Sequence, residues 1–432
     1  MLRPLDLRGA GTDLADRLPR PQPAGAGPVA AVQGILAEVR DRGDEALFEL
    51  TERFDGVRLD SLRVPPDACR AGLERLRPEL RDALEVAIGN ITAYHRTQVG
   101  EEVSHRRDGI EVRDLHRPVD RAGLYVPGGR ASYPSTVLMT AVPARVAGVP
   151  ELALCVPPRR DGSVPDEVLG AAVLAGVDEV YRVGGAQAIA AMAYGTGSIR
   201  PVDVIVGPGN VYVAIAKREV AGVVGIPSAF AGPSEVVVVA DDTTNPALAA
   251  VDLVVQAEHG PDGLAWLVTW SETTAAAVTA AVSALVESSP RRAEIESTLD
   301  QGGYVALVDG PDQAMAVANL IAPEHLELLT TDPEALLPLV RHAGAVFCGP
   351  WSPASVGDYL AGPNHVLPTN GSARFAGALR VDDFRKHVHV VTLDRDALAR
   401  VAPHVIALAE AEGLVTHAES VRARFEPATE AP

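Results

Sequence analysis

The sequence contains few aromatic residues, few cysteines and hardly any lysine. Aromatic residues make up 4% of its 432 residues, and arginine supplies all but two of the 38 basic side chains. The three cysteines, Cys69, Cys155 and Cys348, are widely spaced and form no Cys-x-x-Cys pair. This pattern argues against a disulfide framework and against a thiolate zinc site.

Charge and hydropathy argue against two further classes of protein. The formal net charge is −19, and no basic stretch is interleaved with aromatic residues, so a nucleic-acid backbone would be repelled. No run of ~18 uncharged apolar residues occurs, because Arg145 and Glu151 interrupt the stretch 136–158. The first residues lack the apolar core of a signal peptide. We therefore expect a cytoplasmic protein with no nucleic-acid partner and no membrane partner.

Length and patterning predict an α/β protein of at least two domains. Residues 19–28 are rich in proline and glycine and should form a loop. Long helical patterns follow at 29–53 and 67–97, and from residue 121 short apolar runs alternate with alanine-rich helices, as in mostly parallel sheets. Strands are expected at 151–156, 179–183, 202–206, 235–240, 264–269, 303–307, 344–348 and 387–393. Helices are expected at 165–175, 186–194, 210–220, 246–259, 272–288 and 311–320, with two more after residue 393.

Two glycine-rich segments join an expected strand to an expected helix. They are Val183–Gln187 (VGGAQ) and Val206–Asn210 (VGPGN). Backbone N–H groups and the positive end of the helix dipole at such junctions suit an anionic pyrophosphate. The dinucleotide fingerprint is incomplete, because Tyr212 occupies the third glycine position. Tight turns without a ligand are the alternative interpretation.

Gln256 and His259 stand at the end of an expected helix, three residues apart. This spacing puts both side chains on one face, where they can converge on an ion. Asn245-Pro246 should begin that helix, and Gly260-Pro261 should end it. Taken alone, such a pair is more often a solvated helix end than a metal site.

Polar residues with possible functions occur at four other places in the chain: Ser234; Glu324 with His325; Asp358 with His365; and Glu412 with His417. An adjacent carboxylate and imidazole can handle protons near neutral pH. Taken alone, each cluster is more often a turn or an exposed surface than a functional site. One combination of these residues could hold a single metal ion: Gln256, His259, Asp358 and His417. Its mixed nitrogen and oxygen donors suit Zn²⁺ better than Ca²⁺.

Nine motifs, taken in order, resemble those of histidinol dehydrogenase, the family that catalyses the last step of histidine biosynthesis. They span residues 125 to 417, and the agreement in length extends the resemblance to nearly the whole chain. The motifs are YVPGG (125–129), VGGAQ (183–187), GPGN (207–210), AGPSE (231–235), QAEHG (256–260), APEHLE (322–327), GDY (357–359), NHVLPT (364–369) and EGLVTH (412–417).

The resemblance implies oxidation of L-histidinol to L-histidine in two NAD⁺-dependent steps through an aldehyde, with one Zn²⁺ per subunit. It implies that His325 takes the alcohol proton and that Glu324 helps to activate the water that adds to the aldehyde. The implied zinc ligands are Gln256, His259, Asp358 and His417. The implied substrate contacts are Ser234, Gln256, His259, His325, Asp358, His365, Glu412 and His417. The positions that match NAD contacts are Tyr125, Gln187 and Asn210.

The resemblance also implies a domain plan and an assembly. We expect two incomplete Rossmann-like α/β domains with mostly parallel sheets, an N-terminal helical segment and a small C-terminal appendage. The expected division is 1–28 as an extension, 29–120 with 233–379 as the substrate and metal domain, 121–232 as the NAD-contacting domain and 380–432 as the appendage. Family members are intertwined homodimers, so Glu412 and His417 would complete the site of the neighbouring subunit. An extra proline in the loop 225–230 departs from the family pattern and affects only that loop.

Two rival functions use the same residues. A zinc hydrolase would use Glu324 as the base that activates water and would need no NAD, which would leave both glycine-rich junctions without a purpose. A catalytically silent binding protein would be favoured by loss of Glu324, His325 or a metal ligand, and none of these is missing. Cys348 as the nucleophile of an aldehyde oxidation is a weaker alternative, because a cysteine at the end of a strand is ordinarily a packing residue.

Overall fold

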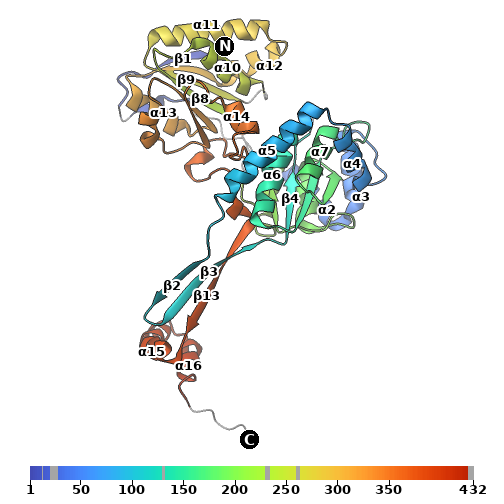
Figure 1. Cartoon of the computed structure of the whole chain (residues 1–432), viewed down its shortest axis with the longest axis vertical. Helices are drawn as coiled ribbons and strands as arrows, with labels where there is room; N and C mark the ends of the chain where they lie inside the picture. Colours follow the sequence, from blue (N-terminus) through green and yellow to red (C-terminus); the bar gives the residue numbers. More distant parts are fainter. Residues whose placement is uncertain (12, 20–27, 129–131, 229–233, 259–262, 427–432) are drawn as a thin grey trace. The chain divides into compact units, whose positions relative to one another are not determined.

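A computed structural model describes residues 1–11, 13–19, 28–128, 132–228, 234–258 and 263–426 (Figure 1). The chain divides into two units. The first comprises Met1–Val99 and Val119–Phe384, and the second comprises Gly100–Pro118 and Arg385–Pro432. Among the described residues, no helix combines the length and the apolar character needed to cross a bilayer.

The first unit contains a parallel sheet of six strands in the order β1-β10-β9-β8-β11-β12. Both faces of this sheet are covered, and Val236 to Val239 are fully buried, as expected for a parallel strand. Two of its strands were not predicted: β1, which lies in the expected N-terminal extension, and β11. The strands are β1 (Arg3–Asp6), β8 (Glu235–Ala240), β9 (Leu264–Thr269), β10 (Gly303–Leu307), β11 (His325–Leu329) and β12 (Ala345–Cys348).

Helices cover the two faces of this sheet (Figure 1). One face packs against α10 (Pro246–Ala257), α11 (Glu272–Ser288) and α12 (Arg292–Gly302). The other face packs against α1 (Leu14–Arg17), α13 (Pro311–Ile321) and the 3₁₀ helix η1 (Glu334–Leu339). The short helix α14 (Ala354–Tyr359) follows β12, and η2 (Ser372–Arg374) and η3 (Val381–Phe384) close the first unit.

A second parallel sheet in the first unit has four strands in the order β6-β5-β4-β7. Its strands are β4 (Arg121–Tyr125), β5 (Glu151–Val156), β6 (Glu179–Arg182) and β7 (Val204–Val206). One face packs against α4 (Pro66–Glu74), α5 (Pro78–Arg96), α6 (Pro134–Ala147) and α7 (Asp166–Leu174). The other face packs against α2 (Val29–Arg42), α3 (Asp44–Asp55), α8 (Gly185–Tyr194) and α9 (Val211–Val220). The expected mixed α/β class with mostly parallel sheets is confirmed.

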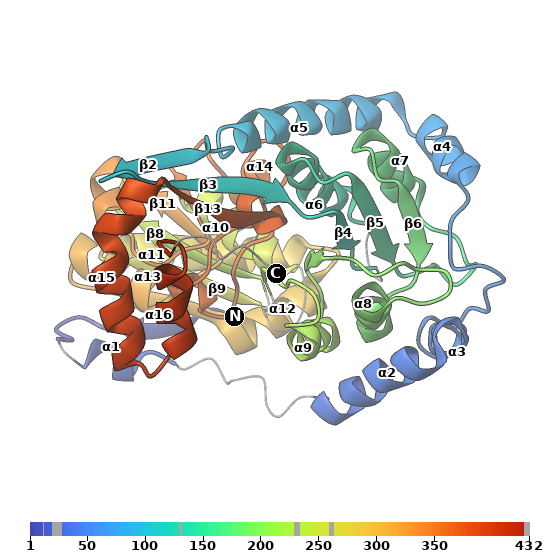
Figure 2. The ribbon, with the colours of Figure 1, turned by 90° about the horizontal axis from the view of Figure 1, so that it is seen from below.

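The two long helical patterns are four helices, and they belong to a different sheet from the one expected. Gly43, with φ +57°, separates α2 from α3, and Arg77 is extended before Pro78, which separates α4 from α5. All four pack on the helices that cover the four-stranded sheet, and Figure 2 shows α2 and α3 beside α8 and α9. Of residues 233–379 only a small part meets them in the described structure: Asn90 of α5 donates to the Leu360 carbonyl at 2.8 Å, and Ile91 shares a core with Val366 and Leu379. The apolar residues of α2 and α3 meet those of α8 and α9 in one core, which explains the difference.

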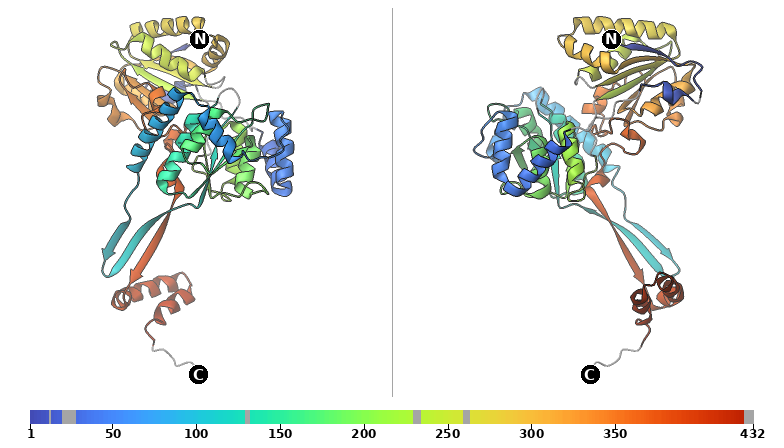
Figure 3. Two further views of the ribbon diagram at one scale, coloured as in Figure 1. Left: turned by 45° about the vertical axis from the view of Figure 1, so that its right-hand side comes forward. Right: turned by 180° about the vertical axis from the view of Figure 1, so that it is seen from behind.

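The second unit is an antiparallel sheet followed by two helices (Figure 3). Its strands run in the order β13-β3-β2, with β2 (Val103–Arg107), β3 (Ile110–Pro118) and β13 (Arg385–Leu393). Asp108 and Gly109 both have positive φ, as in the tight turns that join β-hairpins. The helices are α15 (Arg395–Ala411) and α16 (Val415–Arg422). The appendage therefore includes residues 100–118, which were expected in the metal domain, because β13 needs β3 as its partner.

Candidate active site

The acid and imidazole of the APEHLE motif lie at the amino edge of the six-stranded sheet. His325 is the first residue of β11, a strand that the sequence did not predict, and it pairs with Val236 of β8. Gln256 lies in the last turn of α10, whose start at Asn245-Pro246 is confirmed, since the Asn245 side chain accepts from Ala247 N–H. The amino edge of a parallel sheet receives the carboxyl ends of helices, whose negative dipole ends favour cations.

His325 is the centre of this cluster and is 4% exposed. Its Nδ1 lies 3.2 Å from the Glu235 carbonyl oxygen and 3.5 Å from Gln256 Nε2. Its Nε2 lies 3.6 Å from Asp358 Oδ1. Glu324 Oε2 lies 3.6 Å from His325 Nδ1 and accepts from the Glu235 N–H at 3.1 Å. The structure thus brings together four of the candidate residues: Gln256, Glu324, His325 and Asp358.

Burial and charge set the protonation of this cluster. Burial raises the pKa of Glu324 to about 7, against the opposing effect of His325. Burial alone would lower the pKa of His325, but Asp358 and Glu324 raise it to about 9. Burial and the charge of Glu324 raise the pKa of Glu235 to about 8. Groups that titrate near neutrality are suited to proton transfer.

His365 extends the cluster toward the four-stranded sheet. Its Nδ1 lies 2.9 Å from the backbone oxygen of Asp358, and its Nε2 lies 3.3 Å from Thr136 Oγ1 on α6. Burial lowers the pKa of His365, which favours the neutral imidazole. His365 is therefore held beside Asp358 by a hydrogen bond to its backbone.

Two buried polar atoms of the cluster, Gln256 Oε1 and His325 Nε2, have no hydrogen-bond partner among the described residues. One of them, Gln256 Oε1, points to an ion. A buried carbonyl oxygen without a partner is costly, and a cation held by Gln256 and Asp358 would satisfy it. The donor chemistry therefore fits the zinc ion that the sequence suggested.

The remaining candidates of this set are distributed as follows. Ser234 is half-buried, and its carbonyl accepts from Leu264 N–H at 3.0 Å beside the start of β8. His259 lies outside the described residues. Glu412, which follows α15, and His417, on α16, are exposed side chains of the second unit.

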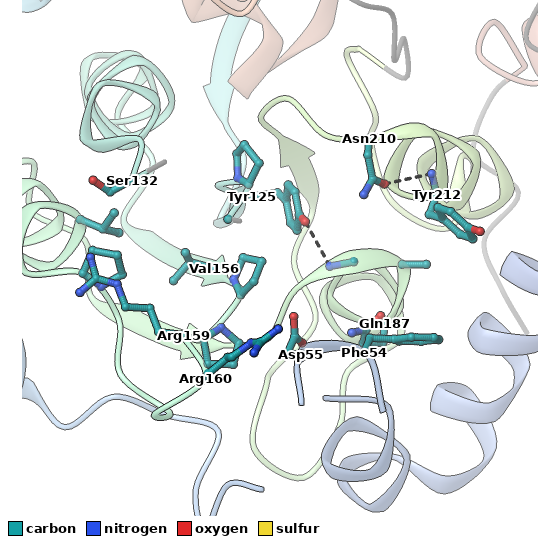
Figure 4. Close-up of a pocket in the computed structure, with 18 of the residues that line it drawn as sticks. Phe54, Asp55, Tyr125, Ser132, Val156, Arg159, Arg160, Gln187, Asn210 and Tyr212 are labelled. Carbon is teal, nitrogen blue, oxygen red and sulfur yellow. Dashed lines mark hydrogen bonds between the residues drawn. The ribbon is translucent and has the colours of Figure 1, made fainter. Parts of the chain in front are cut away.

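The candidate NAD contacts line a cavity of about 850 Å³ at the carboxyl ends of the four-stranded sheet (Figure 4). Tyr125 ends β4, and its hydroxyl accepts from the Gly185 N–H at 3.1 Å. Gln187 lies in the first turn of α8, and Asn210 caps α9 by accepting from Tyr212 N–H at 3.0 Å. Two helix N-termini thus face the cavity, an arrangement suited to phosphate. The sequence missed Arg159 and Arg160, which also line it.

Position 207, between β7 and α9, requires a glycine because of its backbone conformation and its neighbours. Its φ is +111°, and a Cβ there would collide with the carbonyl oxygen of Tyr125. Its own carbonyl accepts from the Nζ of Lys217. The Lys217 side chain is 3% exposed, and this burial lowers its pKa to about 8. The GPGN motif therefore fixes a close approach between two strand ends.

Gly207→Ala is expected to lower the free energy of unfolding by about 3 kcal/mol, because backbone strain and overpacking add. Gly222→Ala is the matched control, since Gly222 has φ +96° but no atom near its would-be Cβ, so strain alone should cost about 1 kcal/mol. Denaturant unfolding of both variants measures the difference. Equal losses would contradict the steric role of Gly207.

A group of metal-capable side chains that sequence reasoning missed lies in the second unit. Asp114, His116 and His387 offer ligand atoms within 4.8 Å of one another. Asp114 Oδ2 lies 3.0 Å from His387 Nδ1 and 3.4 Å from His116 Nε2, whereas Asp114 Oδ1 and His116 Nδ1 are buried and have no hydrogen-bond partner among the described residues. His116 and His387 are directly opposite on β3 and β13, and only strand pairing reveals this.

Comparisons with known proteins show the family to which the chain belongs. The family model described as histidinol dehydrogenase matches residues 19–425. Among the curated relatives, a histidinol dehydrogenase of Parasynechococcus marenigrum (strain WH8102) is 51% identical over 91% of this chain and 90% of its own. One of Thermobifida fusca (strain YX) is 49% identical over 98% and 97%. A crystal structure of histidinol dehydrogenase from Elizabethkingia anophelis has a TM-score of 0.93 at 34% identity and covers 98% of both chains. These matches confirm the resemblance carried by the nine motifs.

Proposed function

Since the chain belongs to the histidinol dehydrogenase family and is thus an oxidoreductase of histidine biosynthesis, we propose that it oxidises L-histidinol to L-histidine through L-histidinaldehyde. Each of the two steps reduces one NAD⁺. The observation that carries the proposal is the buried cluster of Glu324, His325, Gln256 and Asp358, in which two acid–base groups lie beside two oxygen donors.

One Zn²⁺ per subunit would be held by Gln256, His259 and Asp358, and by His417 from a second copy of the chain. When bound, the ion supplies a positive charge that orients the imidazole and amine of the substrate and offsets the Asp358 charge that keeps the pKa of His325 high. The unpartnered Gln256 Oε1 supports this assignment. Ser234, His365 and Glu412 would contact the substrate around this centre.

In the first oxidation, His325 acts as the base. Its Nδ1 lies against the Glu235 carbonyl, which favours a proton on Nδ1 and leaves Nε2 free to accept the alcohol proton. As the O–H bond breaks, hydride leaves the carbinol carbon for NAD⁺, and the aldehyde and NADH form. Asp358 stabilises the resulting imidazolium across 3.6 Å.

In the second oxidation, Glu324 acts as the base. Water adds to the aldehyde carbon while the Glu324 carboxylate takes a proton from it, which gives the anion of the hydrated aldehyde. This anion transfers hydride to a second NAD⁺, and the carboxylic acid that forms loses its proton to solvent and leaves as the carboxylate of L-histidine. Glu324 returns its own proton to solvent before the next turnover. The N–H of Glu235 holds Glu324 Oε2 in place throughout.

NAD⁺ would bind in the cavity beside the four-stranded sheet. The N-termini of α8 and α9 and the side chains of Arg159 and Arg160 suit its pyrophosphate, and Tyr125, Gln187 and Asn210 would contact it. We further propose a cytoplasmic homodimer with shared sites. The three cysteines are free, as is usual in a reducing compartment.

The test is the amount of NADH formed per L-histidinol consumed, at completion and with excess NAD⁺. Two per substrate is expected. One would mean that the reaction stops at the aldehyde and would contradict the role of Glu324. None, from folded and zinc-loaded protein, would favour the hydrolase or the silent binding protein.

A further inference from the structure

Glu327 is a buried acid that the proposed chemistry does not use. It lies two residues after His325 on β11, on the same face of the sheet, and is 1% exposed. Its Oε1 accepts from the N–H of Ala354, the first residue of α14, at 3.2 Å. A buried carboxyl group is costly unless it is paired, so its second oxygen needs a partner as well.

The acid nearest in its effect is Asp252, whose side chain interacts with that of Glu327. It lies on α10, one turn before Gln256 and on the same face of the helix. Glu327 Oε2 forms no hydrogen bond of ordinary length in the described part of the chain. Burial and the charge of Asp252 raise the pKa of Glu327 to about 8. Glu327 therefore carries a proton at neutral pH, which removes the repulsion between the two side chains.

Two parallel connections thus join α10 to β11. Asp252 meets Glu327, and one helical turn later Gln256 Nε2 lies 3.5 Å from His325 Nδ1. The third element is α14, which begins at the Ala354 N–H bound by Glu327 and carries Asp358 one turn later, 3.6 Å from His325 Nε2. A helix of six residues does not hold its own orientation, so its direction depends on such contacts.

We propose that Glu327, together with Asp252, is a positioning residue of the candidate zinc centre, tying α10, β11 and α14 together so that Gln256, His325 and Asp358 keep their mutual geometry. This inference rests on the proposed function, because it assumes that Gln256 and Asp358 bind zinc. Glu327, the last residue of the APEHLE motif, would thus support the site without itself touching the substrate or the ion.

The test compares Glu327→Leu with Glu327→Gln in the full chain. Zinc affinity is measured by competition with a chelator, and kcat and KM for L-histidinol are measured on the same preparations. Glu327→Leu should weaken zinc binding about 10- to 100-fold, the usual effect of losing an outer partner of a ligand. Glu327→Gln should keep wild-type affinity, because its carbonyl still accepts from Ala354 and its amide still donates to Asp252.

Asp252→Ala provides an independent variant if Glu327→Leu does not fold, as judged by its thermal transition. It removes the partner on α10 and should also weaken zinc binding. Wild-type zinc affinity in both Glu327→Leu and Asp252→Ala would overturn the inference, as would equal weakening in Glu327→Gln and Glu327→Leu. Failure of the proposed function is a separate result, in which the unaltered chain binds no zinc or forms no NADH, and it would remove the basis of this inference.

Discussion

Glu324→Gln is expected to form one NADH per L-histidinol where the unaltered chain forms two, with the aldehyde accumulating. The amide can still accept from the Glu235 N–H, so the site should keep its shape, but it cannot take a proton from water. Loss of a positioned base should slow aldehyde oxidation about 100- to 10,000-fold. The measurement is the rate of NADH formation from L-histidinaldehyde beside the rate from L-histidinol.

Glu235→Gln is the matched control for this variant. Its carboxyl group is also buried at the same sheet edge, but its pKa of about 8 keeps it protonated at pH 7, so an amide resembles it closely. This control should keep both half-reactions. Equal slowing of both oxidations in Glu324→Gln would remove the water-activating role of Glu324.

The rate of aldehyde oxidation is expected to rise with pH. Burial raises the pKa of Glu324 from 4.5 to about 7, and only the carboxylate is a base. Aldehyde oxidation should therefore increase as pH rises through about 7 and then level off, and Glu324→Gln should lose this increase. Because the folded state binds this proton more tightly than the unfolded chain, the group's contribution to stability should fall as pH rises from 4.5 toward 7.

Asp358→Asn is expected to deplete zinc and activity together. The substitution removes a charged oxygen donor and the carboxylate that faces His325 Nε2. Zinc affinity should fall more than about 100-fold, beyond the effect of losing an outer partner of a ligand. Metal content after dialysis and kcat on the same sample measure the two losses.

His387→Ala tests whether the zinc binds at this site or at the Asp114, His116 and His387 group of the second unit. His387 belongs to the cluster with Asp114 and His116, and its loss should leave catalytic zinc and turnover unchanged. If His387→Ala loses the zinc and Asp358→Asn keeps it, the ion belongs to the second unit and the proposed ligand set is wrong.

Much of the fold follows from local sequence, and the strands that were missed have two different causes. Strands such as β8 and β9 are apolar runs between turn residues and were predicted at their observed bounds. β11 was missed because a buried strand is expected to be apolar, whereas β11 contains the polar residues His325 and Glu327. β2 and β3 were missed because their stability comes from pairing with each other and with β13.

The site was predicted in part. The motifs identified Glu324, His325, Gln256 and Asp358, and the structure brings these four together. The link from Asp252 to Glu327 could not be predicted, because residues on α10 and β11 become neighbours only when the helix packs on the sheet. The same reason explains the helices at 29–97, whose apolar faces suit either sheet until the tertiary fold selects one.

The scarcity of lysine makes this chain suitable for amine-directed labelling. Lys217 is buried against the Gly207 carbonyl, whereas Lys386 on β13 is exposed. A fluorescent dye coupled to lysine will therefore mark Lys386, a single point in the second unit. Energy transfer between chains labelled at this point can follow their association.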